Sequence, residues 1–273
     1  MLRLETATGW WLVTHPDHAR LAGAIAERWG NDVFAEPEPR DRVLLGIATH
    51  DDGWAVRDAH PSITKLGKPS AFSVELVGRY SAFEEIDLED YLGVRERAVA
   101  EVAAKDAYAA LLVSMHTYNL LTARADRSTI VPEQLPLLDA FLERQRGVQE
   151  RLYKAVKSDP QLTSDDVGRE AIEDGFRLLQ ATDNMSLLAC VDFGGTASLL
   201  HPLRLRGGGV SEVAVEPLGE RRFRLSPYPL KEDEVRIRFP ARFVEGATFG
   251  SSAELEERFL AAAVEELELV LVR

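Results

Sequence analysis

The chain has little of several features that define common classes of protein. Its single cysteine, Cys190, excludes a disulfide framework and any cysteine-rich zinc module. Basic residues number 32 against 45 acidic ones, which gives the 273-residue chain a net charge of −13. Because nucleic-acid phosphates and anionic membrane surfaces repel so acidic a chain, we expect neither nucleic acid nor a membrane as a partner.

Long apolar runs and targeting signals are lacking as well. No run approaches the roughly 20 apolar residues of a membrane span, and the first residues show no basic segment followed by a cleavage site. Neither a phosphate-binding glycine loop nor a nucleophilic serine elbow occurs. With 45% hydrophobic and 28% charged residues, the composition is that of an ordinary globular protein, which we expect to be cytoplasmic.

Apolar residues recur at helical spacing over much of the first two thirds of the chain. This periodicity predicts helices over residues 17–29, 93–124, 137–157 and 165–190. Residues 42–50 are short and almost wholly apolar, so they fit either a buried helix or a strand. Residues 53–71 contain several glycine and proline breaks, which indicate a long structured loop.

The sequence pattern changes after about residue 205, where apolar and polar residues alternate as they do in strands. A last amphipathic helix is expected to begin at the capping pattern Ser251-x-x-Glu254 and to continue to residue 269. We therefore predict a mainly α-helical fold in two parts. A helical body covers residues 1–205, and a small β-strand and helix extension over residues 206–273 packs on it.

Histidine and aspartate residues in apolar surroundings are the candidates for chemistry. His18 begins the first long helix, His50 and Asp51 are adjacent at the end of an apolar segment, and Asp183 lies in the apolar half of a later helix. Such groups are costly to bury unless they are paired, hydrogen-bonded or bound to a metal. Two histidines and two aspartates suit one divalent Fe, Mn, Co, Ni or Zn ion. Taken singly, each residue is also explained as a cap, a surface residue or a polar core residue.

The order of these residues resembles the metal-binding motifs of the HD superfamily of metal-dependent phosphohydrolases. The similar segments are His18-Ala-Arg-Leu-Ala-Gly, His50-Asp51-Asp52-Gly53 and Thr182-Asp183-Asn184-x-Ser186. The resemblance implies an HD-domain-like helical bundle in which His18, His50, Asp51 and Asp183 hold the ion. More narrowly, the whole chain resembles a bacterial family called domain of unknown function 3891, which implies a fold but no known activity.

Several neighbouring residues are candidates for catalysis or for a second ion. Asp52 is a candidate general base, and His116 is a candidate acid or metal ligand, although a buried structural histidine fits equally well. A second ion would draw on His116, His15 and His60. No second His-His or His-Asp pair occurs between the pair His50-Asp51 and Asp183. We therefore expect one bound ion, with two ions as the alternative.

The loop after the His-Asp pair is locally basic in an otherwise acidic chain. Arg57, Lys65 and Lys68 are candidates for binding an anionic substrate, with Trp54 as a wall of the pocket. Ordinary solvated charge and a core tryptophan are the alternatives.

We therefore expect a metal-dependent hydrolase that acts on a small phosphorylated metabolite or nucleotide. One alternative is a di-iron oxygenase of the same fold that acts on a small polar substrate. Another is a non-catalytic protein that binds a metal or a ligand. The sequence leaves a homo-oligomer open.

Overall fold

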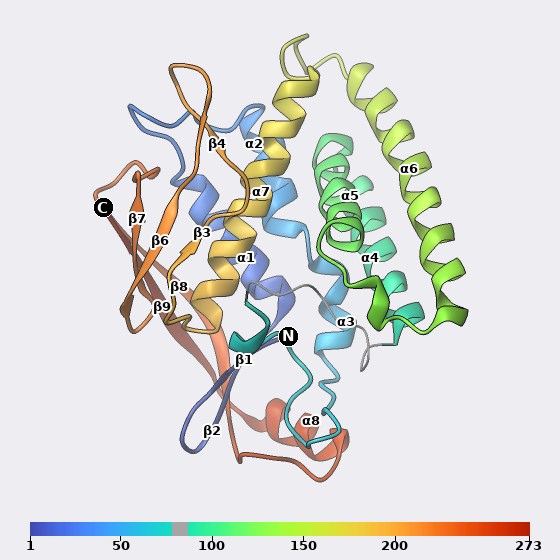
Figure 1. The fold of residues 1–273 in the computed structure, drawn as a ribbon, viewed down its shortest axis with the longest axis vertical. Coiled ribbons are helices and arrows are strands. Elements are labelled where there is room, and N and C mark those ends of the chain that lie inside the picture. The colour runs from blue at the N-terminus through green and yellow to red at the C-terminus, as the bar shows by residue number, and fades with distance from the viewer. Residues whose placement is uncertain (78–86) are drawn as a thin grey trace.

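The computed structural model describes residues 1–77 and 87–273, in which most of the helices pack on one side of a curled sheet and the helix of residues 252–261 packs on the other (Figure 1). Short 3-10 turns occur at Asp52–Trp54, Val74–Leu76, Arg127–Thr129 and Pro132–Gln134. The helices are α1 (His15–Glu27), α2 (Arg40–Thr49), α3 (Ala55–Asp58), α4 (Leu88–Ala103), α5 (Ala107–Thr122), α6 (Leu135–Lys157), α7 (Arg169–Cys190) and α8 (Ser252–Ala261).

Seven strands form one sheet in the order β1-β2-β8-β9-β7-β6-β3. Strands β7 and β9 run parallel, and the other neighbouring pairs of this sheet run antiparallel. The strands are β1 (Leu2–Glu5), β2 (Gly9–Val13), β3 (Ala197–Ser198), β6 (Ala214–Gly219), β7 (Arg222–Ser226), β8 (Glu234–Glu245) and β9 (Val264–Val272). A separate hairpin consists of β4 (Leu203–Arg204) and β5 (Val210–Ser211).

Alternating side chains attach the sheet to the helices. In β8, Val235, Ile237 and Phe239 are buried, whereas the residues between them are exposed. Because successive side chains of a strand point to opposite faces, this pattern directs one face of β8 into the core. The same hydrophobic cluster contains residues of the sheet and of the helices, such as Ile25 and Leu179.

Helix α1 lies at the centre of the molecule. Its N-cap is Thr14, whose hydroxyl accepts a hydrogen bond from the backbone N–H of Asp17. The helix packs against α2, α7 and β8, so that its residues touch both the helical side and the sheet. The beginning of α1 therefore lies inside the molecule, with other helices around it.

The prediction of a mainly α-helical HD-like bundle with a small extension is wrong. The fold is α+β, because β1 and β2 at one end of the chain join β8 and β9 at the other end in one large sheet. The core is likewise built from helices and strands together. The division at residue 205 stays a prediction, although β2 and β8 pair across it.

The predicted last helix is correct only at its beginning. Ser251 caps α8 as expected, but the helix ends at Ala261 and residues 264–272 form β9. The segment VEELELVLV fits helical spacing, yet its side chains also alternate, and pairing of its whole length with residues 234–242 of β8 selects the strand. The undecided segment 42–50 is helical through Thr49, as part of α2, and His50 is the C-cap.

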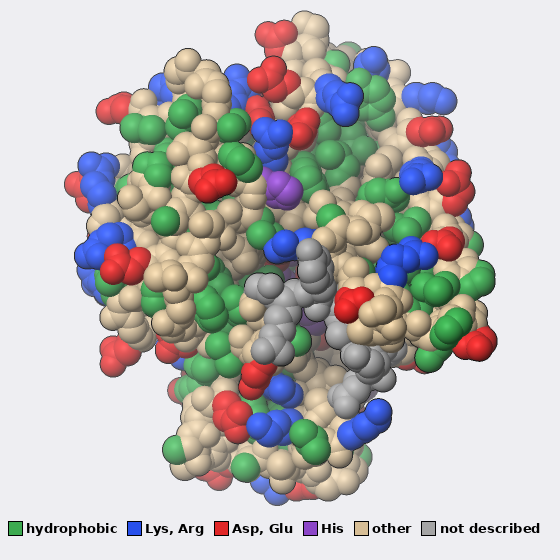
Figure 2. Space-filling view, in the orientation of Figure 1, with side chains coloured by type: hydrophobic (Ala, Val, Ile, Leu, Met, Phe, Trp, Pro, Cys, Tyr) green, Lys and Arg blue, Asp and Glu red, His purple; other side chains and the backbone are tan. Residues whose placement is uncertain are grey.

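On the face in Figure 2, acidic and basic side chains are interspersed rather than gathered by sign. None of the helices in residues 1–77 and 87–273 combines the length and the apolar character needed to cross a membrane.

Candidate metal centre

Five histidine and aspartate side chains from four helices meet in the interior. His18 lies near the start of α1, His116 lies within α5, and Asp183 lies within α7. His50 is the C-cap of α2, and Asp51 follows it. All five are buried, and we call His18, His50, Asp51, His116 and Asp183 the His–Asp cluster.

The hydrogen bonds of His18 fix which of its ring nitrogens faces the cluster. The Ser186 hydroxyl donates its hydrogen to the backbone carbonyl of Asp183, 2.8 Å away. Because that hydrogen is used, the Ser186 oxygen accepts from His18 Nδ1–H at 2.9 Å. His18 Nε2 is thus left facing Asp51 Oδ2 at 3.1 Å.

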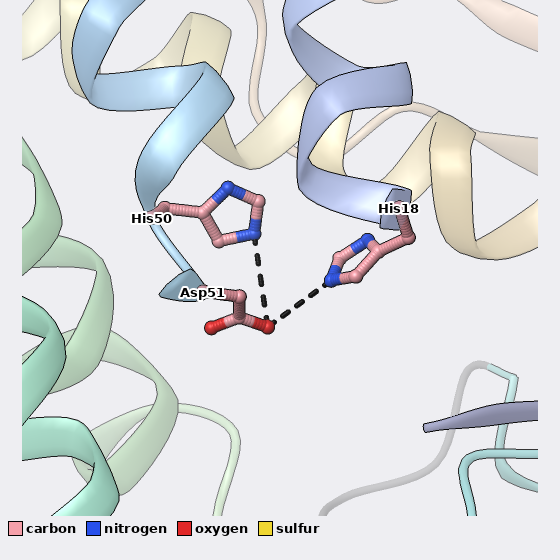
Figure 3. Close-up of side chains that lie close together, drawn as sticks. All are labelled: His18, His50 and Asp51. Atoms are coloured by element: carbon pink, nitrogen blue, oxygen red, sulfur yellow. Dashed lines mark hydrogen bonds and ion pairs between the residues drawn. The ribbon is translucent and has the colours of Figure 1, made fainter. Parts of the chain in front are cut away.

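His50 is held in the same way. Its Nδ1–H donates to the backbone carbonyl of Ile47 at 2.7 Å, and a carbonyl can only accept. Its Nε2 lies 3.3 Å from Asp183 Oδ1 and 3.9 Å from Asp51 Oδ2, and it has no hydrogen-bond partner among the described residues. Figure 3 shows the Nε2 atoms of His18 and His50 pointing toward the same oxygen of Asp51.

The imidazoles of His18 and His50 and the carboxylates of Asp51 and Asp183 require a positive charge between them. With both Nδ1 atoms protonated, each neutral imidazole turns the lone pair of Nε2 toward carboxylate oxygens, which is repulsive. Burial lowers the pKa of His50, but Asp51 and Asp183 oppose it and raise the pKa to about 9. A proton on His50 Nε2 would supply this positive charge, and so would a divalent transition metal, which nitrogen and oxygen donors of this kind bind.

The cluster contains two overlapping groups that could hold a metal ion. They are His18, His50 and Asp51, and His50, His116 and Asp183, with the ligand atoms of each group within 4.8 Å of one another. His50 belongs to both groups but offers one nitrogen, because Nδ1 is bound to Ile47. Since one nitrogen binds one ion, an ion held by either group would use the same nitrogen of His50.

His116 fits the role of a ligand better than that of an acid. Burial lowers its pKa to about 3, so the ring is neutral at physiological pH and has no proton to spare. Its Nδ1 lies 3.0 Å from the side-chain amide of Gln180, whose Oε1 has no partner among the described residues. Rotating this amide by half a turn would let Oε1 accept from Nδ1–H and leave Nε2 free to bind a metal.

Arg95 of α4 belongs to the site, although sequence reasoning missed it. Its guanidinium donates to Asp51 Oδ1 at 2.5 Å and to the Tyr91 hydroxyl at 3.2 Å, and it is buried. Desolvation of Asp51 is outweighed by Arg95 and the histidines, so that the pKa of Asp51 lies well below its usual range. The available signal was position, because Arg95 lies on the stripe of buried residues along α4 with Leu92 and Val99.

Asp52 pairs with surface cations rather than with the His–Asp cluster, and its role as a general base stays a prediction. Its Oδ1 pairs with Arg20 at 2.6 Å, and its Oδ2 lies 3.7 Å from Lys105. Both cations are half exposed. Asp52 therefore anchors surface charges next to the site.

The two other histidines expected at a second metal are placed differently from each other. His15 stacks on Trp54 with ring centroids 4.2 Å apart, and its Nδ1 lies 3.0 Å from Asp58 Oδ2. It contacts His18 edge to face but is in neither metal-binding group. His60 lies on the surface, where it pairs with Glu256 of α8 at 2.9 Å. The structure brings neither residue into a second centre with His116.

The residues expected to bind an anion are also separated. Trp54 is buried, with the guanidinium groups of Arg57 and Arg95 over its ring at 5.4 and 5.2 Å. Arg57 also pairs with Asp90 at 2.8 Å. Lys68 pairs with Glu5 and lies over Trp10, and Lys65 is exposed. Arg57 and Trp54 thus adjoin the site through Arg95, whereas Lys68 is held near β1.

Comparison with known proteins assigns the chain to a family. A family model described as "Protein of unknown function (DUF3891)" matches residues 1–246, and the chain belongs to this family. Neither a search of curated proteins nor a search of solved structures finds a significant match. The family assignment agrees with the narrower of the two resemblances in the sequence.

Proposed function

We propose that this protein is a metal-dependent hydrolase of a small phosphorylated metabolite or nucleotide. One observation carries the proposal. The protons of His18 and His50 are directed outward to Ser186 and Ile47, so both Nε2 atoms face the carboxylates of Asp51 and Asp183. A divalent ion satisfies all four groups at once.

The order of these ligands supports the choice of phosphate chemistry. His18, the pair His50-Asp51 and Asp183 follow one another as do the metal-binding motifs of HD-superfamily phosphohydrolases. The likeness concerns the pattern of ligands and leaves the α+β architecture as described above.

The residues present fit the reaction that such a centre would carry out. A divalent ion held by His18, His50, Asp51 and Asp183 would supply Lewis acidity for activating water and polarising a phosphoryl oxygen. Water would add to phosphorus and lose a proton, the bond from phosphorus to the leaving oxygen would break, and the leaving oxygen would take up the proton that the water lost. Ser186 and Ile47 keep the two imidazoles turned toward the ion, and Arg95 and Arg57 provide positive charge near the substrate's anionic group.

The number of ions separates this proposal from an oxygenase. A di-iron centre needs two sets of ligands, whereas the two groups of the cluster share the single available nitrogen of His50. We therefore place hydrolysis with one ion ahead of di-iron oxygenation. A non-catalytic metal-binding protein would bind the ion equally well, so it is distinguished by turnover alone.

Adjacent aspartates provide a matched pair of variants for testing the metal. We expect about one transition ion per chain in the wild type, measured by plasma mass spectrometry after loading with Mn, Fe, Co, Ni or Zn. Asp51→Asn is expected to lose the ion because Asp51 faces His18, whereas Asp52→Asn is expected to keep it because Asp52 pairs with Arg20. A wild type that stays metal-free after loading would overturn the proposal.

Activity requires a second measurement on the same loaded proteins. Release of inorganic phosphate from a panel of sugar phosphates and nucleotides is expected for the wild type and not for Asp51→Asn. Loaded wild type that binds one ion and releases no phosphate across the panel would favour the non-catalytic alternative.

A further inference from the structure

The two oxygens of the Asp51 carboxylate have different partners. Oδ2 faces the Nε2 atoms of His18 and His50, at 3.1 and 3.9 Å. Oδ1 accepts a hydrogen bond from Arg95 at 2.5 Å, in a buried ion pair. A carboxylate that bridges two metal ions through its two oxygens needs one free oxygen for each ion, and Asp51 has one.

The guanidinium of Arg95 is also held by contacts other than that with Asp51. Its Nε donates to the Tyr91 hydroxyl, and its plane lies near the rings of Trp54 and Tyr91, at 5.2 Å from each centroid. Burial of a charged side chain among aromatic rings is costly unless a counter-ion is present, and Asp51 is that counter-ion. Arg95 is therefore a permanent part of the centre.

We propose that Arg95 is the second cation of this centre: it occupies the oxygen that a second metal ion would need, limits the site to one ion, and makes the loaded site attractive to anions. The inference rests on the proposed metal site. The carboxylates of Asp51 and Asp183 carry two negative charges, which a divalent ion balances. Arg95 then leaves the loaded cluster with one net positive charge. Arg95 thus acts in two ways, by its hydrogen bond to Asp51 and by its charge.

The number of ions bound per chain tests whether the site is limited to one ion. We expect wild-type protein titrated with Mn²⁺ to saturate at one ion per chain by calorimetry and by mass spectrometry. Two ions per chain would overturn this inference and leave the metal site itself intact. No bound ion would overturn the proposed function as well, so the two failures are distinguishable.

Binding of inorganic phosphate to the metal-loaded protein tests whether Arg95 attracts anions to the site. Arg95→Gln can still donate to Asp51 but lacks the charge, so phosphate affinity is expected to fall at least about tenfold while affinity for Mn²⁺ does not fall. Arg97→Gln, at an exposed position of the same helix, is the matched control and is expected to bind phosphate as the wild type does.

Arg95→Lys keeps the charge and covers the case in which the neutral variant does not fold. It is expected to retain phosphate affinity within about threefold of the wild type, because the charge matters more than the shape of the group. Equal phosphate affinity in Arg95→Gln and the wild type would overturn the inference. So would an Arg95→Lys protein that folds and binds Mn²⁺ but has lost phosphate affinity.

Discussion

At the scale of single residues, the decisive contacts are the hydrogen bonds made by the Nδ1 atoms of His18 and His50, which face away from the cluster. Ser186 fixes the tautomer of His18, and the Ile47 carbonyl fixes that of His50. Such contacts orient a metal ligand and raise its basicity, so they affect the metal without touching it. Ser186 is the more informative of the two because its side chain can be removed.

We expect Ser186→Ala to lower metal affinity by about 10- to 100-fold, as loss of an outer hydrogen bond to a ligand does. The variant leaves His18 Nδ1 without its acceptor, so the ring is free to turn or to change tautomer. Competition with a chelator of known affinity measures the change, and Ser164→Ala at an exposed position is the control. Unchanged affinity in Ser186→Ala would show that the His18 tautomer is fixed by another contact.

At the scale of elements, the site depends on how the segment after α2 meets α4. Gly53 lies in the short 3-10 turn after Asp51 and is buried. A Cβ atom on Gly53 would lie 2.6 Å from the backbone nitrogen of Ala98 and 2.7 Å from the carbonyl oxygen of Val94. Glycine thus allows the turn to press against α4, which also carries Arg95.

We expect Gly53→Ala to destabilise the protein by about 1–3 kcal/mol, since backbone atoms must move to make room. Gly93→Ala in α4 is the opposite case, because a Cβ there meets nothing within 4 Å. It should stabilise the helix by up to about 1 kcal/mol. Urea denaturation of the metal-free proteins measures both, and a neutral Gly53→Ala would show that the turn and α4 have room to separate.

At the scale of the whole molecule, helices and sheet share one hydrophobic core. The single cysteine, Cys190 at the end of α7, is buried in that core. Burial raises the pKa of its thiol, so the reactive thiolate is disfavoured in the folded protein. Labelling of Cys190 therefore requires the core to open and reports on the stability of the molecule.

Metal binding is expected to slow the labelling of Cys190 by a thiol reagent. At a free metal concentration of 100 times the dissociation constant, the folded state gains about 2.7 kcal/mol, which corresponds to roughly 100-fold slower labelling. Asp51→Asn should show no such effect because it lacks a ligand. Equal labelling rates with and without metal in the wild type would indicate that Cys190 reacts through a local opening.

The sequence by itself determined which residues form the His–Asp cluster and where three long helices lie, whereas the single helix expected over residues 93–124 is α4 and α5. His18, the pair His50-Asp51 and Asp183 are recognisable because charged and imidazole groups are costly in apolar helices, and the structure brings them together. Helical periodicity is a local property, so α1, α6 and α7 follow from their own residues.

Only the tertiary structure decided which strands form the sheet and which residues Arg95 contacts. It alone also decided that Asp51 and Asp52 have different partners. Strands β1, β2 and β9 are stabilised by partners far away in the chain, so their own residues do not settle their conformation. The approach of α4 to the end of α2 places Arg95 on Asp51. Adjacent aspartates then point to different surroundings, since consecutive side chains at a helix end diverge while the sequence shows them side by side.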